Sequence, residues 1–476
     1  MPRRVKSAQM TMAVLLATGL LSGCSATKPK SQPTAQPHAG TVVDVDPAVR
    51  YQTWQGWGTS LAWFAYVLGG APDKIRNHIA DLLFDPTKGL GLNVVRYNIG
   101  GGENPQYNFM DPRARVPGYE PSPGKFDWQA DKTQRWMLQA AKDRGANVFE
   151  AFSNSPPYWM TNSGSVTGAK DGGDNLKASD YQAFAEYLAT VVKHFQTAWH
   201  IDFSTVEPFN EPVSNWWKFG GTQEGAHFDN ASQSKLIPML TTALQQQGLH
   251  TGIAAPDDNS VDETLASWNA YPSAVQHDVT QINTHGYNGS DRQGLNAAAA
   301  KAGKNLWMSE YGDGDSSGMT MSTEIIADVK QLKPTAWVYW QAVDGPGWGM
   351  LQMDVNHPGH DQFKTTEKYY VMENYSKFIR PNYQFIQIGL PNALAAYNRA
   401  QHTLVIVTTN ASSVQNTYDY NLKQFSKLGA SVKVYRTSKD EHLKQLAAIP
   451  ITQSSFSAVA KSKSVTTYVL TGVEAK

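Results

Sequence analysis

Two carboxylates four positions apart, Glu207 and Glu211, frame the segment EPFNEP and raise the question of which one does chemistry. The segment reads as the end of a strand, where side chains alternate, so both glutamates and Phe209 are expected on one face. Four residues of strand separate the two carboxylates by roughly 13 Å, which is too far for one small reacting centre. Glu211 stands beside Pro212, where the strand must stop, and is therefore the candidate. We interpret Glu207 as a hydrogen-bonded interior or rim group.

A second carboxylate in a comparable position is Glu310, in the segment WMSEYGDG. Cleavage of a glycosidic bond needs such a pair, because one carboxyl group protonates the leaving oxygen while the other stabilises or attacks the anomeric carbon. Either glutamate alone could equally be a salt-bridged rim residue. Together, at the tips of the fourth and seventh predicted strands, Glu211 and Glu310 favour two-carboxylate chemistry.

Eight short apolar runs, each followed by a polar or glycine-rich end and then a helical stretch, would bring these residues together. Eight strands alternating with helices predict an α/β fold of the (β/α)8 TIM barrel type. The C-terminal ends of barrel strands build the active face, so the polar strand ends should converge. The predicted strands are Trp54–Ser60, Asn93–Gly102, Asn147–Pro157, Ser204–Pro212, Thr251–Asp258, Gln281–Tyr287, Asn305–Gly314 and Ala336–Gly345.

Two of the segments between the strands have the amphipathic period of helices. They are Asp127–Gly145 and Ser179–Gln196, and Ser179 is predicted to cap the second. With these helices, residues 54–375 form the predicted barrel.

The pattern changes after Tyr375 to alternating strands without long helices. This predicts an appended antiparallel β-sandwich over residues 376–476, packed on the barrel. Residues 41–53 are predicted to add one or more strands to the sandwich.

The N-terminus has the features of a targeting segment. A basic start and the uncharged run MTMAVLLATGLL precede LSGCS, which resembles a bacterial lipoprotein signal with Cys24 as the lipidated residue. Residues 1–24 are therefore predicted to be a signal peptide, and the Pro/Ala/Gln-rich residues 25–40 a flexible tether. The alternative is an ordinary signal peptide with an incidental cysteine. Since Cys24 is the only cysteine, disulfides within the chain are excluded. We expect an exported protein held by its lipid on the periplasmic or cell-surface face of a membrane.

The bulk charge argues against a nucleic-acid partner. The chain of 476 residues has 41 basic and 41 acidic side chains and an isoelectric point near 7.2, so it lacks the charge excess that such surfaces require. The 14 Trp and 21 Tyr suit a neutral carbohydrate partner, because aromatic faces stack on sugar rings, although tryptophan is also a common core residue.

A set of motifs resembles one family of carbohydrate-active enzymes. The segments GWGTSLAW, NVVRYNIGGG, NSPPYWM, EPFNEP, WWKFGGTQEG, THGY, SEYGDG and VYWQAVDGPGWG are similar to glycoside hydrolase family 30, in the large clan of retaining barrel enzymes. The phrases GTQEG and SEYGDG are closest to its endo-β-1,6-galactanase branch. The resemblance covers Tyr51 to about Pro381, and YSKFIRP is similar to the family's entry into its sandwich.

The resemblance implies roles for individual residues. Glu211 would be the acid/base, Glu310 the nucleophile and Asn210 the group that holds the sugar 2-hydroxyl. Arg96 would lie near the nucleophile. The remaining predicted substrate-binding residues are Trp57, Asn154, Trp159, His285, Tyr287 and Trp340.

One departure from the family pattern affects the distal part of the site. The segment NIGGGENP contains an extra acidic residue, Glu103, and a long loop follows it. The family resemblance therefore does not define the shape of the distal subsites.

Two segments have spacings that could suggest a metal site. Asp313–Glu324 matches the EF-hand pattern, but a strand precedes it and Ser317 replaces a usual ligand, so we interpret the match as chance. Asp354–Asp361 groups acidic and histidine residues without helical spacing, which is typical of a hydrogen-bonded loop. The two-carboxylate mechanism requires neither, and we predict no metal and no cofactor.

The predicted function is a retaining endo-glycosidase that cleaves β-1,6 linkages in galactan or arabinogalactan side chains by double displacement. A β-1,6-glucanase or an exo-acting β-galactosidase of the same fold is the alternative. A carbohydrate-binding surface lipoprotein that has lost catalysis is another. The predicted partners are a polysaccharide or oligosaccharide and, through the lipid, a membrane, and we expect a monomer.

Overall fold

The computed structural model describes residues 40–355 and 363–476. The predicted signal peptide with Cys24, and all but the last residue of the predicted tether, lie outside the described residues. Most of the Asp354–Asp361 segment lies outside them as well.

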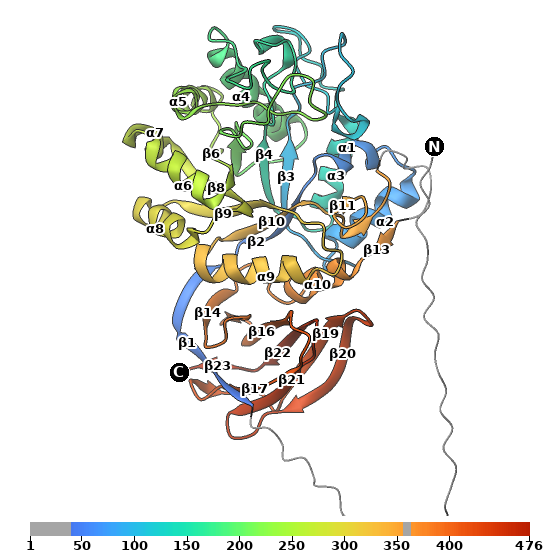
Figure 1. Ribbon diagram of the computed structural model, residues 1–476, viewed down its shortest axis with the longest axis vertical. Coiled ribbons are helices and arrows are strands. Elements are labelled where there is room, and N and C mark those ends of the chain that lie inside the picture. The colour runs from blue at the N-terminus through green and yellow to red at the C-terminus, as the bar shows by residue number, and fades with distance from the viewer. Residues whose placement is uncertain (1–39, 356–362) are drawn as a thin grey trace, which may run out of the picture. The chain divides into compact units, whose positions relative to one another are not determined.

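A closed barrel of parallel strands confirms the predicted (β/α)8 architecture (Figure 1). Strands β2 to β6 pair in sequence order, β6 pairs with β8, and the ring closes through β9 and β10 back to β2. Each strand overlaps one predicted run. The eight strands are β2 (Gly56–Ser60), β3 (Val94–Asn98), β4 (Val148–Phe152), β5 (Thr205–Glu207), β6 (Gly252–Ala254), β8 (Val279–Asn288), β9 (Asn305–Tyr311) and β10 (Ala336–Gln341).

Burial explains why these segments are strands. All residues of β2 and β3 are buried, as expected for parallel strands that are packed inside the barrel and covered by helices outside. The β-branched start of β3, VVRYN, suits that environment, and its single charged residue, Arg96, must then find buried partners.

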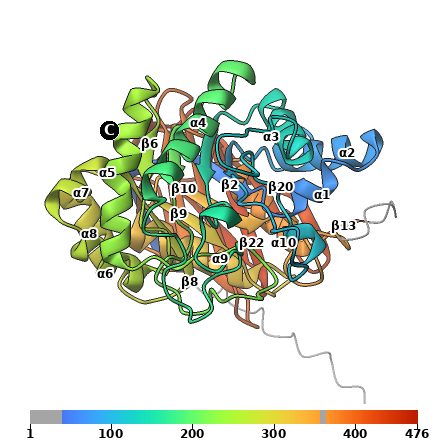
Figure 2. The same ribbon diagram turned by 90° about the horizontal axis from the view of Figure 1, so that it is seen from above.

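Helices surround the strands, as the view from above shows (Figure 2). The helix α4 presents Phe184, Leu188, Val191 and Phe195 to the core at helical spacing. The helices are α1 (Phe64–Leu68), α2 (Asp73–Phe84), α3 (Lys132–Asp143), α4 (Tyr181–Ala198), α5 (Asn230–Gln246), α6 (Val261–Ala270), α7 (Ser273–Asp278), α8 (Arg292–Ala302), α9 (Met319–Ala327) and α10 (Glu367–Ser376).

The predicted cap of α4 is wrong. The N-cap position is Asp180, and no side chain caps the helix there. The hydroxyl of Ser179 donates to the Asp180 carboxylate at 2.8 Å instead of accepting from a backbone amide.

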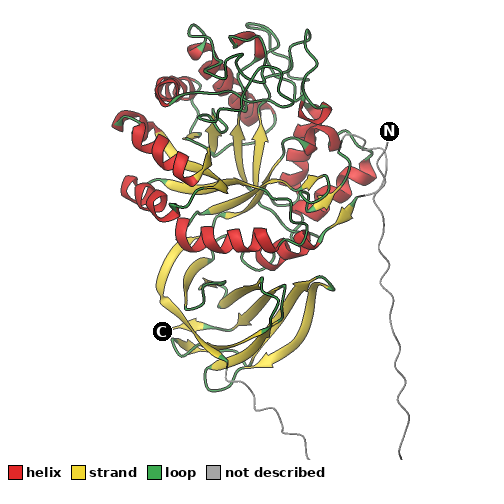
Figure 3. Ribbon diagram, viewed as in Figure 1, coloured by secondary structure: helices red, strands yellow, loops and turns green. Residues whose placement is uncertain are grey.

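A second sheet of nine strands lies next to the barrel (Figure 3). Eight of its strands follow the barrel in sequence, and β1 precedes it. Its order is β20-β19-β22-β16-β15-β14-β1-β17-β21, and its pairs are antiparallel except β1 with β17. The strand β1 (Thr41–Thr53) thus lies between β14 and β17, far from its neighbours in sequence. The others are β14 (Gln384–Ile388), β15 (Ala393–Asn398), β16 (Thr403–Asn410), β17 (Asn416–Asn421), β19 (Ser431–Ser438), β20 (Glu441–Pro450), β21 (Ser455–Ala460) and β22 (Ser464–Thr471).

Helix α10 connects this sheet to the barrel through buried polar contacts. The hydroxyl of Tyr375 lies 2.6 Å from Ser322 Oγ on α9 and 3.2 Å from Thr409 Oγ1 on β16. Asn374 donates to Thr437 Oγ1 on β19 at 2.6 Å. Barrel residues and the face of β16 that carries Val405 and Val407 also belong to one apolar core, so the sandwich packs against the barrel helices.

Within residues 40–355 and 363–476, no helix has the length and apolar character needed to cross a membrane.

Candidate active site

A cavity of about 480 Å³ lies at the C-terminal ends of the barrel strands. This is the face on which the polar strand ends were predicted to converge. Predicted residues that line it are Asn154, Asn210, Glu211, Tyr287, Glu310 and Trp340.

Glu211 reaches the cavity from a loop rather than from a strand. The strand β5 ends at Glu207, so the prediction that Glu207 and Glu211 share one strand face is wrong. Pro208 and Pro212 lack the N–H groups that a continuing ladder would need. Glu211 has a left-handed backbone, with φ of 48°, and its N–H donates to the carbonyl of Asp257 at 2.9 Å. This backbone turn directs the carboxylate into the cavity.

Glu207 lies beneath the cavity floor. It is fully buried and accepts a hydrogen bond from Asn283 at 2.6 Å. Burial and the neighbouring carboxylates of Asp257 and Glu150 raise the pKa of Glu207 well above its ordinary value, while Arg96 opposes the shift. The structure therefore places Glu207 as an interior hydrogen-bonded group.

Glu310 is held at the end of β9 by two donors. The hydroxyl of Tyr287 donates to Oε1 at 3.0 Å, and Nη1 of Arg96 lies 3.3 Å from Oε2. Burial raises the pKa of Glu310 to about 7, and the positive charges of His285 and Arg96 oppose that rise. The two donors favour the ionised form of a carboxylate that burial would otherwise neutralise.

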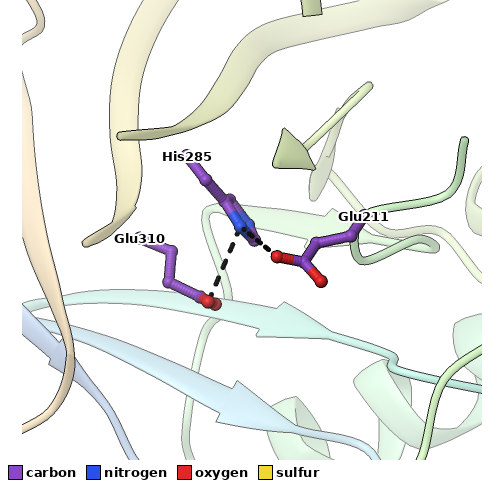
Figure 4. A group of neighbouring side chains, drawn as sticks. All are labelled: Glu211, His285 and Glu310. Atoms are coloured by element: carbon purple, nitrogen blue, oxygen red, sulfur yellow. Dashed lines mark hydrogen bonds and ion pairs between the residues drawn. The ribbon is translucent and has the colours of Figure 1, made fainter. Parts of the chain in front are cut away.

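The two predicted carboxylates face each other across His285 (Figure 4). Nδ1 of His285 lies 3.3 Å from Glu211 Oε1 and 3.6 Å from Glu310 Oε1, and the three ligand atoms lie within 4.8 Å of one another. The other ring nitrogen lies 3.2 Å from Asp257 Oδ2. Burial disfavours the imidazolium, but Glu310 and Asp257 raise the pKa of His285 well above 6.5. A cation therefore lies between the carboxylates.

Two residues that the sequence did not indicate hold the Glu211 carboxylate. Asn259 donates to Oε1 at 2.6 Å, and the indole of Trp216 donates to Oε2 at 3.3 Å. Asn259 stands one position beyond the fifth predicted run, which ended at Asp258. Trp216 lies in the quoted WWKFGG segment, so its motif was recognised but its contact was not.

Two buried amide atoms in the cavity are available to a substrate. Oδ1 of Asn210 and Nδ2 of Asn154 have no hydrogen-bond partner among the described residues. An acceptor and a donor placed beside the carboxylates suit the hydroxyl groups of a sugar.

Arg96 and His285 lie beneath the cavity rather than on its surface. Arg96 is fully buried and donates to Glu150 at 2.9 Å and to Asp257 at 2.8 Å, in addition to its contact with Glu310. The predicted nearness of Arg96 to Glu310 therefore holds in the structure. Both side chains are placed to act through the carboxylates, so the expectation that they contact substrate is wrong.

The structure contradicts the prediction for Trp57, and it places the half-buried Trp159 outside the lining of the cavity. Trp57 is fully buried near the start of β2, where its indole donates to the carbonyl of Ile379 at 2.9 Å and packs on Trp54 and Trp337. Trp159 is half-buried, and its indole donates to the carbonyl of Glu120 at 2.7 Å. Both rings belong to the packed interior and its edge rather than to the cavity.

Glu211, His285 and Glu310 are close enough together to hold a metal ion. Metal binding by histidine requires the neutral ring, because the coordinating nitrogen must offer a lone pair. The carboxylates around His285 favour its protonated form, so a metal ion would have to displace that proton.

In the EF-hand-like segment, protein groups bind at least one carboxylate oxygen of Asp313, Asp315 and Glu324, although Oδ2 of Asp313 has no hydrogen-bond partner among the described residues. Asp313 accepts from Lys368 at 3.0 Å, Asp315 accepts from the amides of Ser317 and Thr320, and Glu324 pairs with Arg292. These contacts give the acidic residues structural roles.

Comparisons with known proteins agree on one family. The sequence model described as "O-Glycosyl hydrolase family 30" matches residues 41–287. An endo-beta-1,6-galactanase of Hypocrea rufa is 37% identical over 465 residues, which cover 91% of this chain and 95% of that protein. An exo-beta-1,6-galactobiohydrolase of Bifidobacterium longum subsp. longum is 27% identical over 425 residues, covering 65% of this chain and 27% of that longer protein.

Solved structures share the fold at lower sequence identity. A conserved exported protein from Bacteroides fragilis has a TM-score of 0.81 at 23% identity, covering 90% of this chain and 100% of that one. The catalytic domain of a xylanase C from Talaromyces cellulolyticus has a TM-score of 0.71 at 20% identity, with the same coverage of 90% and 100%.

Proposed function

Since this chain belongs to glycoside hydrolase family 30, we propose that it is a retaining endo-glycosidase that cleaves β-1,6-galactosidic linkages in galactan and arabinogalactan side chains. The linkage and the endo action rest on the similarity to the Hypocrea rufa galactanase. The observation that carries the chemistry is the pair of carboxylates, with oxygens within 4.8 Å of each other in a cavity on the active face of the barrel.

The separation of the carboxylates supports retention of configuration. Retaining enzymes place the two groups about 5 to 5.5 Å apart, whereas inverting enzymes leave about 6.5 to 9.5 Å for a water molecule. Glu211 and Glu310 fit the shorter separation.

In the first step, Glu310 attacks the anomeric carbon and a glycosyl ester forms as the glycosidic C–O bond breaks. Glu211 gives its proton to the leaving oxygen. In the second step, Glu211 takes a proton from water, the resulting hydroxyl adds to the anomeric carbon, and Glu310 leaves as a carboxylate. The sugar then has its original configuration.

The surroundings of the two carboxylates support this assignment of roles. Glu310 is aligned from below by Arg96 and from the side by Tyr287, and both contacts favour the anion that must attack. Glu211 stands beside Trp216, which is 49% exposed. Glu211 itself is buried, but it lines the cavity, where it can serve first the leaving sugar and then a water molecule.

Exo action on the same linkage is the second candidate. It is supported by the similarity to the Bifidobacterium longum exo-beta-1,6-galactobiohydrolase. A β-1,6-glucanase remains the third, because the galactose and glucose units differ only at the 4-hydroxyl. A binding protein without catalysis is disfavoured, since both carboxylates and their donors are in place.

We also propose that the chain is exported and that lipid on Cys24 anchors it to a membrane as a monomer. The support is the LSGCS segment after an apolar run and the proline-rich stretch that follows. Such an anchor would hold the enzyme where polysaccharide is available.

The test is hydrolysis by the purified protein of unbranched β-1,6-galactan and, in parallel, β-1,6-glucan. We expect reducing ends from galactan only, with oligomers of several lengths at early times and β-configured new ends in the proton NMR spectrum. Galactobiose as the sole early product would establish the exo alternative, and release from glucan alone would establish the glucanase. The Glu310→Gln variant is the control for contaminating activity.

A further inference from the structure

Trp348 is an aromatic side chain of the cavity that belongs to the quoted VYWQAVDGPGWG segment but has no role in the two-carboxylate mechanism. It lines the cavity and is 41% exposed, in the loop between β11 (Val343–Asp344) and β12 (Leu351–Gln352). A Cβ atom added to Gly312 would lie 2.8 Å from the ring, so the indole rests directly against the backbone two residues after Glu310. The ring is thus seated beside the proposed nucleophile.

The loop that carries Trp348 is fastened from outside the cavity by Lys368. This lysine stands at the start of α10 and is fully buried. Its ammonium group donates to the carbonyls of Gly347 at 3.0 Å and Trp348 at 3.4 Å. It also lies 2.7 Å from the Asp313 carbonyl, 3.0 Å from the Asp313 carboxylate and 2.9 Å from the Tyr339 hydroxyl, so its three N–H groups are shared among five acceptors. The Tyr339 hydroxyl in turn donates to the Trp348 carbonyl at 2.5 Å.

The same ammonium therefore joins two loops. Asp313 lies in the loop after β9, and Gly347 and Trp348 lie in the loop after β11. The loops also touch directly, because a Cβ atom added to Gly347 would lie 2.7 Å from the carbonyl oxygen of Gly314. Gly347 has a φ of 88°, which a side chain would strain. Lys368 and this close approach fix the backbone of Trp348.

A contribution to folding stability is a weak explanation for the buried pair of Lys368 and Asp313. Burial lowers the pKa of Lys368, and the charge of Asp313 offsets part of that effect. Replacing buried ion pairs with apolar residues often costs little, and in some proteins such pairs serve to define a geometry. Here the geometry defined is that of an exposed indole in a sugar-sized cavity.

We propose that Trp348 is a stacking platform for a galactosyl residue of the bound chain and that Lys368 is the positioning residue that holds it. The indole offers a flat apolar face, and the C–H face of a sugar ring is its natural partner. Asp313, the first residue of the EF-hand-like segment, serves as the counter-charge of Lys368. This inference deepens the proposed function and rests on it for the identity of the sugar.

The kinetic test compares the wild type with Trp348→Ala, Lys368→Met and the double variant on unbranched β-1,6-galactooligosaccharides. We expect each single variant to raise KM by about tenfold, equivalent to ~1.4 kcal/mol, with a smaller change in kcat. The double variant should match Trp348→Ala, because Lys368 acts through Trp348. A wild-type KM in Lys368→Met, or additive effects in the double variant, would overturn the proposal.

Lys330 provides a matched control. It is partly buried, whereas Lys368 is fully buried, and its ammonium donates to the carbonyls of Leu390 at 2.6 Å and Ala393 at 3.2 Å, in the sandwich. Lys330→Met should lower the melting temperature but leave KM at the wild-type value. An equal rise of KM in Lys330→Met would show that the Lys368 effect is general destabilisation.

A second measurement does not depend on activity. In protein labelled with 5-fluorotryptophan, the ¹⁹F resonance of Trp348 is the one missing from Trp348→Phe. We expect it to move in Lys368→Met and to stay in place in Lys330→Met, and an unmoved resonance would refute the link between Lys368 and Trp348. If Lys368→Met does not fold, Asp313→Asn provides the same test by removing the counter-charge.

The two proposals can fail separately. An inactive wild type on β-1,6-galactan would refute the function, while the ¹⁹F shifts would still decide whether Lys368 positions Trp348. Hydrolysis with an unchanged KM in Trp348→Ala would refute the platform and leave the function standing.

Discussion

The hydroxyl of Tyr287 donates a hydrogen bond of 3.0 Å to Oε1 of Glu310, so the proposed nucleophile is aligned by a neighbour from the adjacent barrel strand. Tyr287 lies on β8 and Glu310 on β9, and both line the cavity. A donor in this position favours the carboxylate form that burial disfavours.

Replacing Tyr287 with phenylalanine removes that donor and keeps the ring. A hydrogen bond to a charged group contributes about 1.5 to 3 kcal/mol, so we expect kcat/KM on β-1,6-galactan to fall roughly tenfold to a hundredfold. The measurement is steady-state kinetics at several pH values. A variant with wild-type kcat/KM would show that the hydroxyl does not assist Glu310.

The acidic limb of the pH profile of kcat/KM should lie at an unusually high pH. Glu310 must be ionised to attack, and burial raises its pKa from 4.5 to about 7. Activity should therefore be lost as pH falls through about 7, because protonation removes the nucleophile. A limb near the ordinary pKa of 4.5 would contradict the effect of burial.

Replacing His285 should shift the pH at which the acidic limb occurs. Its positive charge lowers the pKa of Glu310, so the His285→Asn variant should lose activity at a higher pH than the wild type. The control is His227→Asn, which removes a histidine paired with Asp174 away from the cavity. A shift to lower pH in His285→Asn, or an equal shift in both variants, would contradict the proposed charge arrangement.

Arg96 should be essential for folding stability as well as for the site. Its removal in Arg96→Met leaves Glu150, Asp257 and Glu310 without their shared buried cation, which typically costs ~3 to 5 kcal/mol. Urea denaturation measures this loss. Lys427→Met, which breaks an exposed pair with Glu474, should cost about 1 kcal/mol or less. Equal costs in the two variants would refute the buried network.

Loss of the lipid should change where the protein is found in the cell without changing its activity. Cys24→Ser should release the protein from the membrane fraction of cells, while the purified variant retains wild-type kcat/KM. The measurement is fractionation followed by mass spectrometry of the N-terminal peptide. A wild-type peptide without lipid would refute the anchor.

The barrel could be predicted from sequence because each strand combines an apolar run with a polar end. The segment VVRYN of β3 shows this clearly, since its buried length and its convergent charged residue are both visible in the letters. The two catalytic candidates were found in the same way, as carboxylates at strand ends.

The sequence did not predict the position of side chains that backbone turns and long-range contacts determine. Strand alternation suggested that Glu211 continues β5, whereas its left-handed backbone places it in a loop. The residue type alone did not reveal that Trp57 lies in the core while Trp340 and Trp348 line the cavity. The burial of a tryptophan depends on the packed fold. The donor Asn259 reaches Glu211 from 48 positions away, which no local pattern reveals.

The roles of the two glutamates are tested most directly by azide rescue of Glu310→Ala and Glu211→Ala. Without the nucleophile, Glu310→Ala should be inactive on every substrate, and azide should restore activity only by giving a product of inverted configuration. Glu211→Ala should still form the glycosyl ester from an aryl galactoside whose leaving group needs no acid. Azide should then release that ester with retention. On galactan, loss of the acid should lower activity by about 10² to 10⁴. The reverse pattern of rescue, or Glu207→Ala behaving as expected of Glu211→Ala while Glu211→Ala stays near wild type, would contradict the account.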